Sequence, residues 1–300
     1  MALKYLAIFI IIPIVYARID IKIKASDDPT KQYVRVSGSD RNIISDTERH
    51  TFQLGDNNLK NAVNTHFGKR PDDAFLRSPT PWGDLYQTYG WNQVNCILTP
   101  SSARILGVSS TPTMVFTQIF HNNSSLSSTF NAQIQQQIQS TVTSTWEKEG
   151  AFTVGQEINY GYDIEVFAVT GTTSYSYTAK WGESVTKTES VTVGSQSGVE
   201  MPLQPGQSVV AELFATRGTM KIQVDYQARL SGSVAVNYSK KHNGHHFWRL
   251  DVNSVMRSAN MKTSITSKEI IEVGFYSDSK VVVRDYDTHA VLYVIPMQIF

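Results

Sequence analysis

Three histidines close together near residue 245 are the first residues in this sequence whose type and spacing suit chemistry. His242, His245 and His246 occur in the run Lys-Lys-His-Asn-Gly-His-His-Phe-Trp. A metal site needs imidazoles aimed at one point and a further ligand beside them. Gly244 instead favours a polar hairpin tip next to buried aromatic rings, so we expect no metal here. Sensing of acidic pH is an alternative, because histidine titrates at about pH 6.5.

Signatures of common catalytic sites are absent from the sequence. It contains no Gly-rich phosphate loop, no HExxH motif and no GxSxG motif, and acidic pairs such as Asp72–Asp73 fall in polar segments. The single cysteine, Cys96, excludes an intramolecular disulfide and any zinc site built on several thiolates. In an oxidising compartment it would be buried or link two chains, and we expect burial. We predict a non-enzyme with no catalytic residues and no cofactor.

The charge of the chain is close to balanced. Lys and Arg number 27 against 26 Asp and Glu, and Lys4 is the one charged residue in an expected leader. A nucleic-acid-binding protein needs a basic excess to match the phosphates, so we exclude nucleic acid as a partner. A hydrophobic share of 41%, with 11% aromatic residues, indicates a globular chain rather than a disordered one.

Residues 1–17 have the pattern of a secretory signal peptide. Lys4 provides the positive start, Leu6–Val15 is almost wholly apolar, and Ala17 offers a small residue for cleavage. The apolar stretch is too short to span a bilayer as a helix. We therefore expect a secreted, extracellular protein. Three Asn-X-Ser sequons for N-glycosylation fit that route: Asn122, Asn123 and Asn237.

Residues 18–110 have a mixed character and predict a small α/β N-terminal lobe. A helix is expected over Leu59–Phe67, ended by Gly68. A strand is expected over Asn92–Leu98 and should stop at Pro100. Residues 111–300 differ, because apolar and polar side chains alternate there with a period of two, as in strands.

One of these strands is expected to be unusually long. From Phe130 to Trp146 the even positions are mainly apolar, whereas the odd positions are almost all Gln, Asn, Thr or other polar residues. At about 3.3 Å per residue this segment would span roughly 55 Å, although an ordinary strand has about five or six residues. Further alternating segments follow, with glycines 218 and 232 as turns or bulges: 184–193, 209–216, 220–230, 270–275 and 281–285. We predict a mostly β, elongated fold of long antiparallel strands.

Hydroxyl side chains dominate the middle of the chain. About 24 of the 80 residues from His121 to Glu200 are Ser or Thr. Such a composition is typical of disordered linkers, but a linker has no reason to keep an apolar parity. Small uncharged hydroxyls are tolerated in water and along a water-filled lumen. A sheet built from them can rearrange without leaving a buried charge unpaired.

These features together resemble the aerolysin-type β-pore-forming family, in its ETX/MTX2 branch. Four successive segments carry the resemblance: the Ser/Thr-rich strand 127–146, a glycine and aromatic segment over 150–177, a second Ser/Thr-rich strand over 182–193, and Val-Glu-Met-Pro-Leu-Gln-Pro-Gly at 199–206 before the strand 208–215. Upstream, Trp-Gly-Asp-Leu-Tyr at 82–86 and Trp-Asn-Gln-Val at 91–94 look like insect aerolysin-like proteins related to spherulin-2A. The chain therefore looks closest to these insect spherulin-2A-like proteins.

The resemblance implies a soluble monomer that binds a cell surface, assembles into a homo-oligomeric ring and donates a β-hairpin to a transmembrane barrel. The implied partners are membrane lipid or a cell-surface receptor or glycan. By position, the inserting hairpin is 150–177, with its tip near Asn159–Asp163. The inserting side chains would be Phe152, Val154, Ile158 and Tyr160 in the first arm and Ile164, Val166 and Ala168 in the second. The first arm alternates as a barrel strand should, the second has mixed faces, and the alternative is a hairpin that never leaves the body.

Four aromatic residues within ten positions could contact a partner: Trp82, Tyr86, Tyr89 and Trp91. They would form either a glycan- or membrane-contacting patch or the core of the N-terminal lobe. The function we favour is a secreted pore-forming toxin, venom component or defence factor. One alternative is a secreted insect yolk or storage protein that keeps the fold without the pore. Another is a carbohydrate-binding module that uses these aromatic rings.

Overall fold

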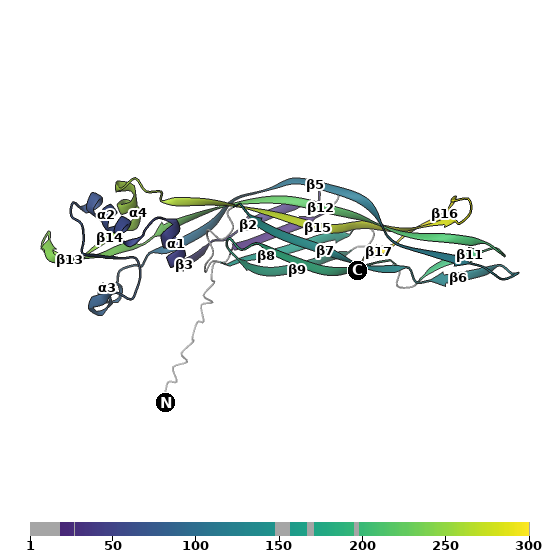
Figure 1. Ribbon diagram of the computed structural model, residues 1–300, viewed down its shortest axis with the longest axis horizontal. Coiled ribbons are helices and arrows are strands. Elements are labelled where there is room, and N and C mark those ends of the chain that lie inside the picture. Colours follow the sequence, from purple (N-terminus) through teal and green to yellow (C-terminus); the bar gives the residue numbers. More distant parts are fainter. Residues whose placement is uncertain (1–18, 27, 148–156, 167–170, 195–197, 300) are drawn as a thin grey trace, which may run out of the picture.

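The structure, a computed structural model, describes residues 19–26, 28–147, 157–166, 171–194 and 198–299. The expected signal peptide lies outside these residues, as do Phe152, Val154 and Ala168 of the expected inserting set. The molecule is elongated, with helices and short strands at one end and long strands that run to the other end (Figure 1). We call the helical end the head and the opposite end the tail.

Four helices and one small sheet form the head. They are α1 Asp46–Thr51, α2 Asp56–Phe67, α3 Pro81–Tyr89, α4 Val252–Ser258, β4 Asp73–Phe75, β13 Ser233–His242 and β14 His245–Asp251. Helix α2 confirms the expected helix, and Gly68 ends it with a φ of 79° that glycine adopts without strain. The sheet order is β14-β13-β4, so segments from both halves of the chain build the head.

An eight-stranded sheet forms the body and continues into the tail. Its order is β17-β10-β7-β15-β12-β5-β3, with β16 paired to β15. The strands are β3 Asp40–Ile43, β5 Asn95–His121, β7 Gln135–Trp146, β10 Val185–Gly194, β12 Ser208–Ser231, β15 Ser264–Asp285, β16 Val291–Pro296 and β17 Gln298–Ile299. All pairs in this sheet are antiparallel, which confirms the mostly β, elongated fold class.

Two expected strand limits are wrong. The strand expected to stop at Pro100 continues as β5 through Pro100 and Pro112. Beyond Leu98, β5 pairs only with β12 among the described strands, and proline is tolerated on such an edge. The two short strands expected over 270–285 are one strand of 22 residues, β15. The expected boundary near residue 110 falls inside β5.

The long strand expected up to Trp146 is interrupted. β6, Ser128–Ala132, pairs with β11, Val199–Leu203, whereas β7 begins at Gln135 and pairs with β10 and β15. At the break, Gly194 of β10 approaches the Ile134 carbonyl so closely that a Cβ would lie 2.1 Å from its oxygen. The predicted parity holds in β7, where alternate residues are buried: Ser140, Val142, Ser144 and Trp146.

β12 is the central strand of the molecule. Its even residues from Met220 to Leu230 are buried, as the alternation predicts. The segment 209–216 also buries alternate residues, here the odd ones: Val209, Ala211, Leu213 and Ala215. Gly218 lies within β12, next to the bulge at Thr216/Arg217, rather than in a turn. The ring of Phe275 occupies the space beside it, and a Cβ at Gly218 would lie 2.3 Å from that ring.

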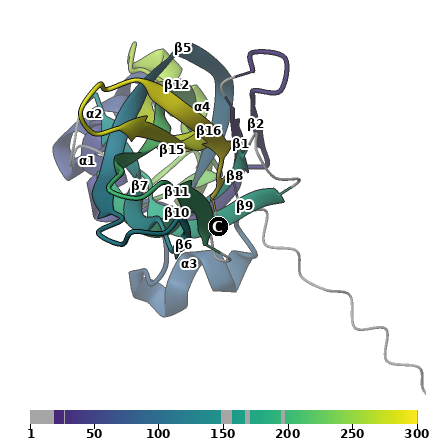
Figure 2. The same cartoon turned by 90° about the vertical axis from the view of Figure 1, so that its right-hand side faces the viewer.

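A second, four-stranded sheet lies against the body, in the order β2-β1-β8-β9. Its strands are β1 Ile19–Ala25, β2 Tyr33–Ser37, β8 Glu157–Val166 and β9 Gly171–Lys180. Figure 2, viewed along the long axis, shows these strands together on one side of the molecule. The larger buried apolar cluster joins head, body and second sheet, and a smaller one fills the tail. No helix among the described residues is long and apolar enough to cross a membrane.

Candidate functional site: the β8–β9 hairpin and its seat

The segment predicted to insert forms a hairpin, but its turn is elsewhere. β8 and β9 pair antiparallel over ten residue pairs, and the connecting residues 167–170 lie outside the described part. The expected tip at Asn159–Asp163 is wrong, because these residues form the middle of β8. Ile158, Tyr160, Ile164 and Val166 therefore belong to one strand rather than to two arms.

With this register the hairpin has one apolar and one polar face. Its buried or half-buried apolar face consists of Ile158, Tyr160, Tyr162 and Ile164 of β8 and Tyr175, Tyr177 and Ala179 of β9. On the other face, Thr178 donates to Asn159 Oδ1 at 2.9 Å and Ser174 donates to Asp163 Oδ1 at 2.7 Å.

β1 holds one edge of the hairpin. Seven residues of β1 pair in parallel with β8, from Ile19 opposite Ile158 to Ala25 opposite Ile164. The apolar side chains of β1 are fully buried beside those of β8. On the polar face, Asn159 Nδ2 donates to Asp20 Oδ1 at 3.2 Å. We call β1 and the body strands under the apolar face the seat of the hairpin.

Three tyrosines form a stack inside the hairpin. The ring centroids of Tyr160 and Tyr177 are 4.8 Å apart, and those of Tyr162 and Tyr177 are 5.8 Å apart. The hydroxyls of Tyr162 and Tyr177 share a hydrogen bond of 3.1 Å. At the end of β9, the buried indole of Trp181 donates to Ser267 Oγ of β15 at 2.9 Å. Aromatic rings thus connect the two hairpin strands and fix the hairpin to the body.

Glu269 of β15 lies buried beneath the hairpin and accepts hydrogen bonds from hydroxyl groups on three strands. Tyr160 of β8 donates to its Oε1 at 2.7 Å, Tyr226 of β12 donates to its Oε2 at 2.6 Å, and Ser144 of β7 also donates to Oε1. Burial raises the pKa of Glu269, and the hydrogen bonds from these hydroxyls oppose that rise only in part. Burial also raises the pKa of Tyr160 and Tyr226, so both hydroxyls keep their protons at neutral pH.

The sequence contained a signal for Glu269 that our reading missed. Glu269 shares its parity in β15 with the buried residues Ile271, Val273 and Phe275. A carboxyl group on the apolar face of a strand is costly unless hydrogen bonds satisfy it, so its position alone marks a buried polar site. Its donors could not be named from the sequence, because they come from three distant strands.

The part of the hairpin near its turn packs less completely than the part at Tyr160. A cavity of about 200 Å³ separates Tyr162, Ile164 and Tyr175 from Ser140 and Val142 of β7. The half-buried ring of Tyr177 lies 5.8 Å from the ammonium group of the exposed Lys187. Side chains that border a void lack dispersion contacts on that side, which makes this half of the seat the weaker one.

The four aromatic residues predicted as a patch divide between core and surface. Tyr86 is buried, and its hydroxyl lies 2.8 Å from the carbonyl oxygens of both Phe75 and Ser233, to either of which it can donate. Trp82 and Tyr89 are 47% and 50% exposed. Trp82 contacts Phe247 with ring centroids 5.2 Å apart, and Tyr89 stacks on Trp91 at 4.9 Å. We call Trp82, Tyr89, Trp91 and Phe247 the aromatic patch; Phe247 was not predicted.

Backbone strain and a cleft accompany the aromatic patch. Trp82 and Asp84 have φ values of 64° and 61°, a region that residues other than glycine seldom occupy and that clusters at functional sites. A cleft of about 350 Å³ lies next to the patch, lined by Tyr89, Trp91, His245 and other residues of the β13–β14 turn. The arrangement offers ring faces and polar groups to a ligand on the head.

The histidines lie at a hairpin tip, as the sequence predicts, between β13 and β14. His242 Nε2 is 3.1 Å from the Phe67 carbonyl, and His246 Nδ1 is 2.7 Å from the Tyr238 carbonyl. Within the described residues, no group of three or more His, Cys, Asp or Glu side chains is arranged to hold a metal ion. Cys96 is buried, as expected, and burial raises the pKa of its thiol.

The three sequons differ in their surroundings. Asn122 is 2% exposed, and the two N–H groups of its side-chain amide are shared among the carbonyls of Leu126, Leu203 and Gln204. Asn237 is also buried and donates to Asp73 Oδ2 at 3.1 Å. Asn123 is exposed. A glycan on Asn122 or Asn237 would displace these hydrogen bonds, so Asn123 is the sequon that the folded chain leaves accessible.

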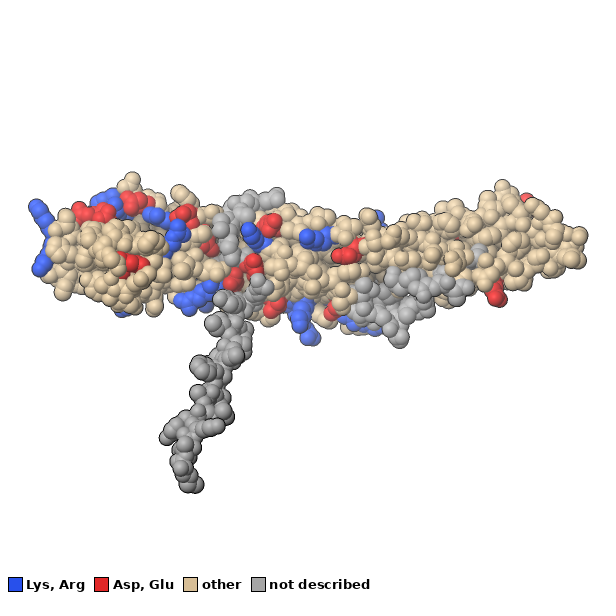
Figure 3. Space-filling view, turned by 90° about the horizontal axis from the view of Figure 1, so that it is seen from below, with Lys and Arg blue, Asp and Glu red and all other residues tan. Residues whose placement is uncertain are grey.

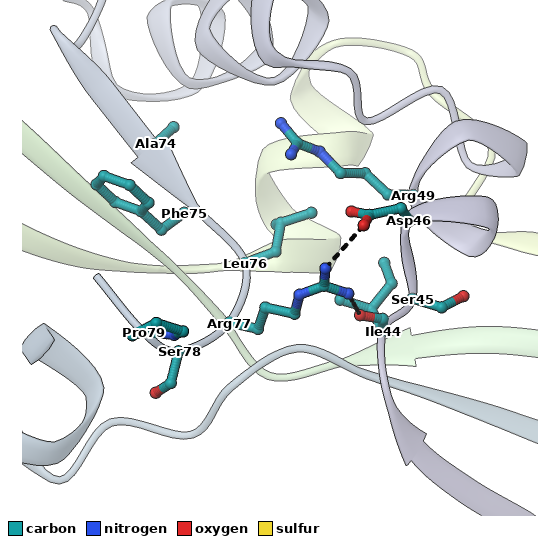
Figure 4. A pocket seen from close by; sticks show the side chains of 10 residues that line it. All are labelled: Ile44, Ser45, Asp46, Arg49, Ala74, Phe75, Leu76, Arg77, Ser78 and Pro79. Carbon is teal, nitrogen blue, oxygen red and sulfur yellow. Dashed lines mark hydrogen bonds and ion pairs between the residues drawn. The ribbon is translucent and has the colours of Figure 1, made fainter. Parts of the chain in front are cut away.

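A pocket of about 260 Å³ lies in the head between α1 and the segment after β4 (Figure 4). Arg77 donates to Asp46 Oδ2 at 3.0 Å and to the Ile44 carbonyl at 2.5 Å. Arg49 Nε donates to the Leu54 carbonyl at 2.6 Å. Both guanidinium groups are engaged with oxygen atoms of the protein, so the pocket ties α1 into the head and we assign it no function.

The chain is 37% identical over 286 residues to U-megalopygitoxin(8)-Mo12 of Megalopyge opercularis, and the alignment covers 95% of this chain and 98% of the relative. The chain belongs to the U-megalopygitoxin(8) family. U-megalopygitoxin(8)-Mc8 of Megalopyge crispata is 36% identical over 286 residues, with the same coverage. No protein-family model matches the chain.

Among solved structures, the parasporin-2 toxin of Bacillus thuringiensis has the same fold. The two structures superpose with a TM-score of 0.56 at 18% identity, over 82% of this chain and 98% of parasporin-2. This likeness shows that the chain has an elongated, aerolysin-like β fold. The fold that the resemblance implies is confirmed, and the relatives of this chain are named as toxins.

Proposed function

We propose that this chain is a secreted pore-forming toxin whose β8–β9 hairpin leaves its seat and joins hairpins of other copies in a transmembrane barrel. The observation that carries the proposal is the pattern of the hairpin, two strands of ten residues with one apolar and one polar face. A tilted barrel strand needs about 9–11 residues, with one face toward lipid and the other toward the lumen. Closure into a barrel then pairs the backbone groups that an open edge would leave unsatisfied in lipid.

Attachment to a cell surface is the first step of this function. The relative of known structure is described as a toxin that recognizes cancer cells. In this chain the aromatic patch and its cleft offer a contact for membrane lipid or for a receptor or glycan, because exposed rings bind both sugar faces and lipid interfaces. No enzymatic step is part of this proposal. Closeness to insect spherulin-2A-like proteins within the family stays a prediction.

A disulfide between hairpin and seat tests the proposal. Asp20 and Asn159 are paired across β1 and β8, so Asp20→Cys with Asn159→Cys would lock the hairpin to β1. A matched control is Lys221→Cys with Glu272→Cys, which links paired positions of β12 and β15 within the body. Cys96 is buried and should not compete for either bridge.

The readout is dye release from liposomes of phosphatidylcholine, phosphatidylserine and cholesterol. We expect the oxidised hairpin lock to release dye at least tenfold more slowly than the wild type, with full recovery after reduction. The oxidised control should release dye as the wild type does. Undiminished release by the oxidised lock would show that the hairpin does not insert. Wild-type protein that never releases dye, before or after proteolytic trimming, would favour the storage alternative.

A further inference from the structure

β16 is an uncharged apolar edge of the tail. It pairs on one side with β15, and no other described strand pairs with it. Four consecutive residues, from Val291 to Val294, are exposed apolar side chains, and Val294 is 56% exposed. Soluble proteins usually shield such edges with charges, prolines or bulges, because a bare edge pairs with another chain. β16 carries no charged side chain, but Pro296 ends it and its ladder with β15 is irregular between Val283 and Arg284, so the stretch open to a further strand is residues 291–295.

The opposite edge of the same sheet lies at the same level along the molecule. Val294 is opposite Val282 of β15, Val282 is opposite Glu212 of β12, and Glu212 is opposite Thr117 of β5. Thr117 therefore occupies the same row as Val294, three strands away. Beyond Leu98, β5 has no second strand partner among the described residues. Both outer edges of this four-stranded part of the tail are thus available to a strand.

The β5 edge resembles the β16 edge in chemistry. The segment 105–120 of β5 contains no Lys, Arg, Asp or Glu, and neither does β16. Met114 and Ile119 beside the row of Thr117 are exposed apolar residues. On the face seen in Figure 3, charged side chains are frequent over the head and body and sparse toward the tail. Two uncharged apolar edges can pair without burying an unpaired charge.

Strand directions decide how copies can meet. β16 runs antiparallel to β15, β15 antiparallel to β12, and β12 antiparallel to β5, so β16 and β5 run in opposite directions. Two copies that point the same way therefore bring β16 of one beside β5 of the next as an antiparallel pair, the geometry of an ordinary sheet. Pairing of β16 with β16 would instead turn one copy upside down, and the two heads would face opposite ways.

We propose that β16 of one copy adds to the β5 edge of the next, and that this contact assembles the chain. Because the two surfaces differ, the contact is heterologous, and repetition with a closing rotation gives a ring in which every copy has the same orientation. The inference deepens the proposed function, because such a ring places all β8–β9 hairpins at one level. The occupant of each edge is a second copy of this chain.

Paired cysteines across the contact test its geometry. Val294→Cys with Thr117→Cys puts one thiol on each edge, in the same row, and both positions are exposed. After oxidation, alone and on the liposomes used above, we expect a ladder of trimers and larger covalent species, because each copy links to two neighbours. Each single variant should form dimers at most. A double variant that gives no species beyond those of the single variants, in both conditions, would overturn the proposal.

A charge exchange tests it without covalent chemistry. Thr117→Lys with Val294→Lys places like charges across the contact, whereas Thr117→Lys with Val294→Glu places opposite charges there. We expect the first pair to lower the fraction of oligomer on liposomes at least tenfold and the second to restore most of it. Both monomers should melt like the wild type, because both side chains point to solvent. Equal assembly by the two pairs would contradict the proposed contact.

The two proposals fail in different ways. If the wild type releases dye, and the edge variants assemble and release dye as it does, the edge contact is refuted and pore formation is not. A cross-linked ladder without dye release would support the edge contact and refute pore formation.

Discussion

β8 and β12 both bury every second side chain, yet the two strands are held very differently. β12 pairs with β5 over 24 residues and with β15 over 21, and all of these bonds belong to the body. β8 pairs with β9 over ten residues and with β1 over seven. If the hairpin leaves, the pairing of β8 with β9 is kept, and the one strand pairing of β8 that is broken is that with β1.

Removal of the hairpin thus costs fewer backbone hydrogen bonds than removal of β12. What holds the hairpin is its apolar face, the hydrogen bond from Tyr160 to Glu269 and the hydrogen bond from Trp181 to Ser267. Buried polar contacts of this kind stabilise one arrangement while they are satisfied and can be exchanged for water when the face opens. We infer that the spine of β12, β5 and β15 is the permanent part of the molecule and the hairpin is the detachable part.

The largest effect should come from the same truncation made in each region. Ile222→Ala in β12 and Ile164→Ala in β8 remove equal volumes from buried sites. Such changes cost about 2–5 kcal/mol of unfolding free energy. We expect Ile222→Ala near the top of that range and Ile164→Ala near the bottom, because Ile164 already borders a cavity. Denaturant unfolding followed by fluorescence measures both, and a larger loss for Ile164→Ala would reverse the comparison.

Removal of the carboxyl group under the hairpin should act on the hairpin more than on the spine. Glu269→Ala leaves the hydroxyls of Ser144, Tyr160 and Tyr226 without their acceptor, at about 1–3 kcal/mol for each buried group that stays unsatisfied. Hydrogen exchange of β8 amides should accelerate at least tenfold more than that of β12 amides. Glu269→Gln, which keeps an acceptor, is the control. Equal acceleration in both strands would contradict a separate hairpin unit.

Acidification should raise the stability of the folded state through protonation of Glu269. Burial holds the folded-state pKa of Glu269 above its unfolded value of about 4.5, so protonation favours the folded state. That stabilisation is complete below pH of about 4.5 and is lost as the pH rises through the folded-state pKa. The groups that face Glu269 are Ser144, Tyr160 and Tyr226, and the raised pKa of both tyrosines keeps them neutral throughout.

Thermal unfolding between pH 5 and 8 measures this dependence. Relative to Glu269→Gln, the wild type should lose stability as the pH rises over this range. Parallel curves for the two proteins would show that Glu269 does not titrate in the folded state. The sign also means that protonation of Glu269 does not release the hairpin in an acidic compartment.

The smallest effect is expected at the edge of the hairpin. Lys187→Ala removes the ammonium group that lies near the ring of Tyr177, and exposed cation–π pairs contribute about 0.5–1 kcal/mol. We expect a loss within that range and faster exchange confined to β9. Lys221→Ala, an exposed lysine paired with Glu272 on the spine, is the comparison and should leave β9 unchanged.

The spine was predictable from the sequence, whereas the hairpin register was not. The alternation from Met220 to Leu230 has one solution, since a shift by one residue would expose every apolar side chain. In the hairpin, Gly161 imitates a turn residue in the middle of β8, and the connecting residues 167–170 read Phe-Ala-Val-Thr, with no turn signal. A tip predicted by position, near Asn159–Asp163, therefore falls in the middle of β8.

The seat could not be predicted for a different reason. Its contacts join residues far apart in the chain, such as Tyr160 and Glu269, or Ile19 and Ile158. Periodicity shows which face of a strand is buried but not which strand covers it. The aromatic patch was half predictable, because Trp82, Tyr89 and Trp91 are close in sequence, whereas Phe247 joins them through the fold.

Hydrogen exchange of β1 on liposomes tests the detachable hairpin most directly. In solution, β1 amides are protected between β2 and β8. When the protein binds liposomes, we predict that the β1 amides that face β8 lose their protection from exchange. The amides of β12 should keep their protection, and those of β8 and β9 should stay protected by their pairing with each other. Unchanged protection of β1 on liposomes that leak would contradict departure of the hairpin from its seat.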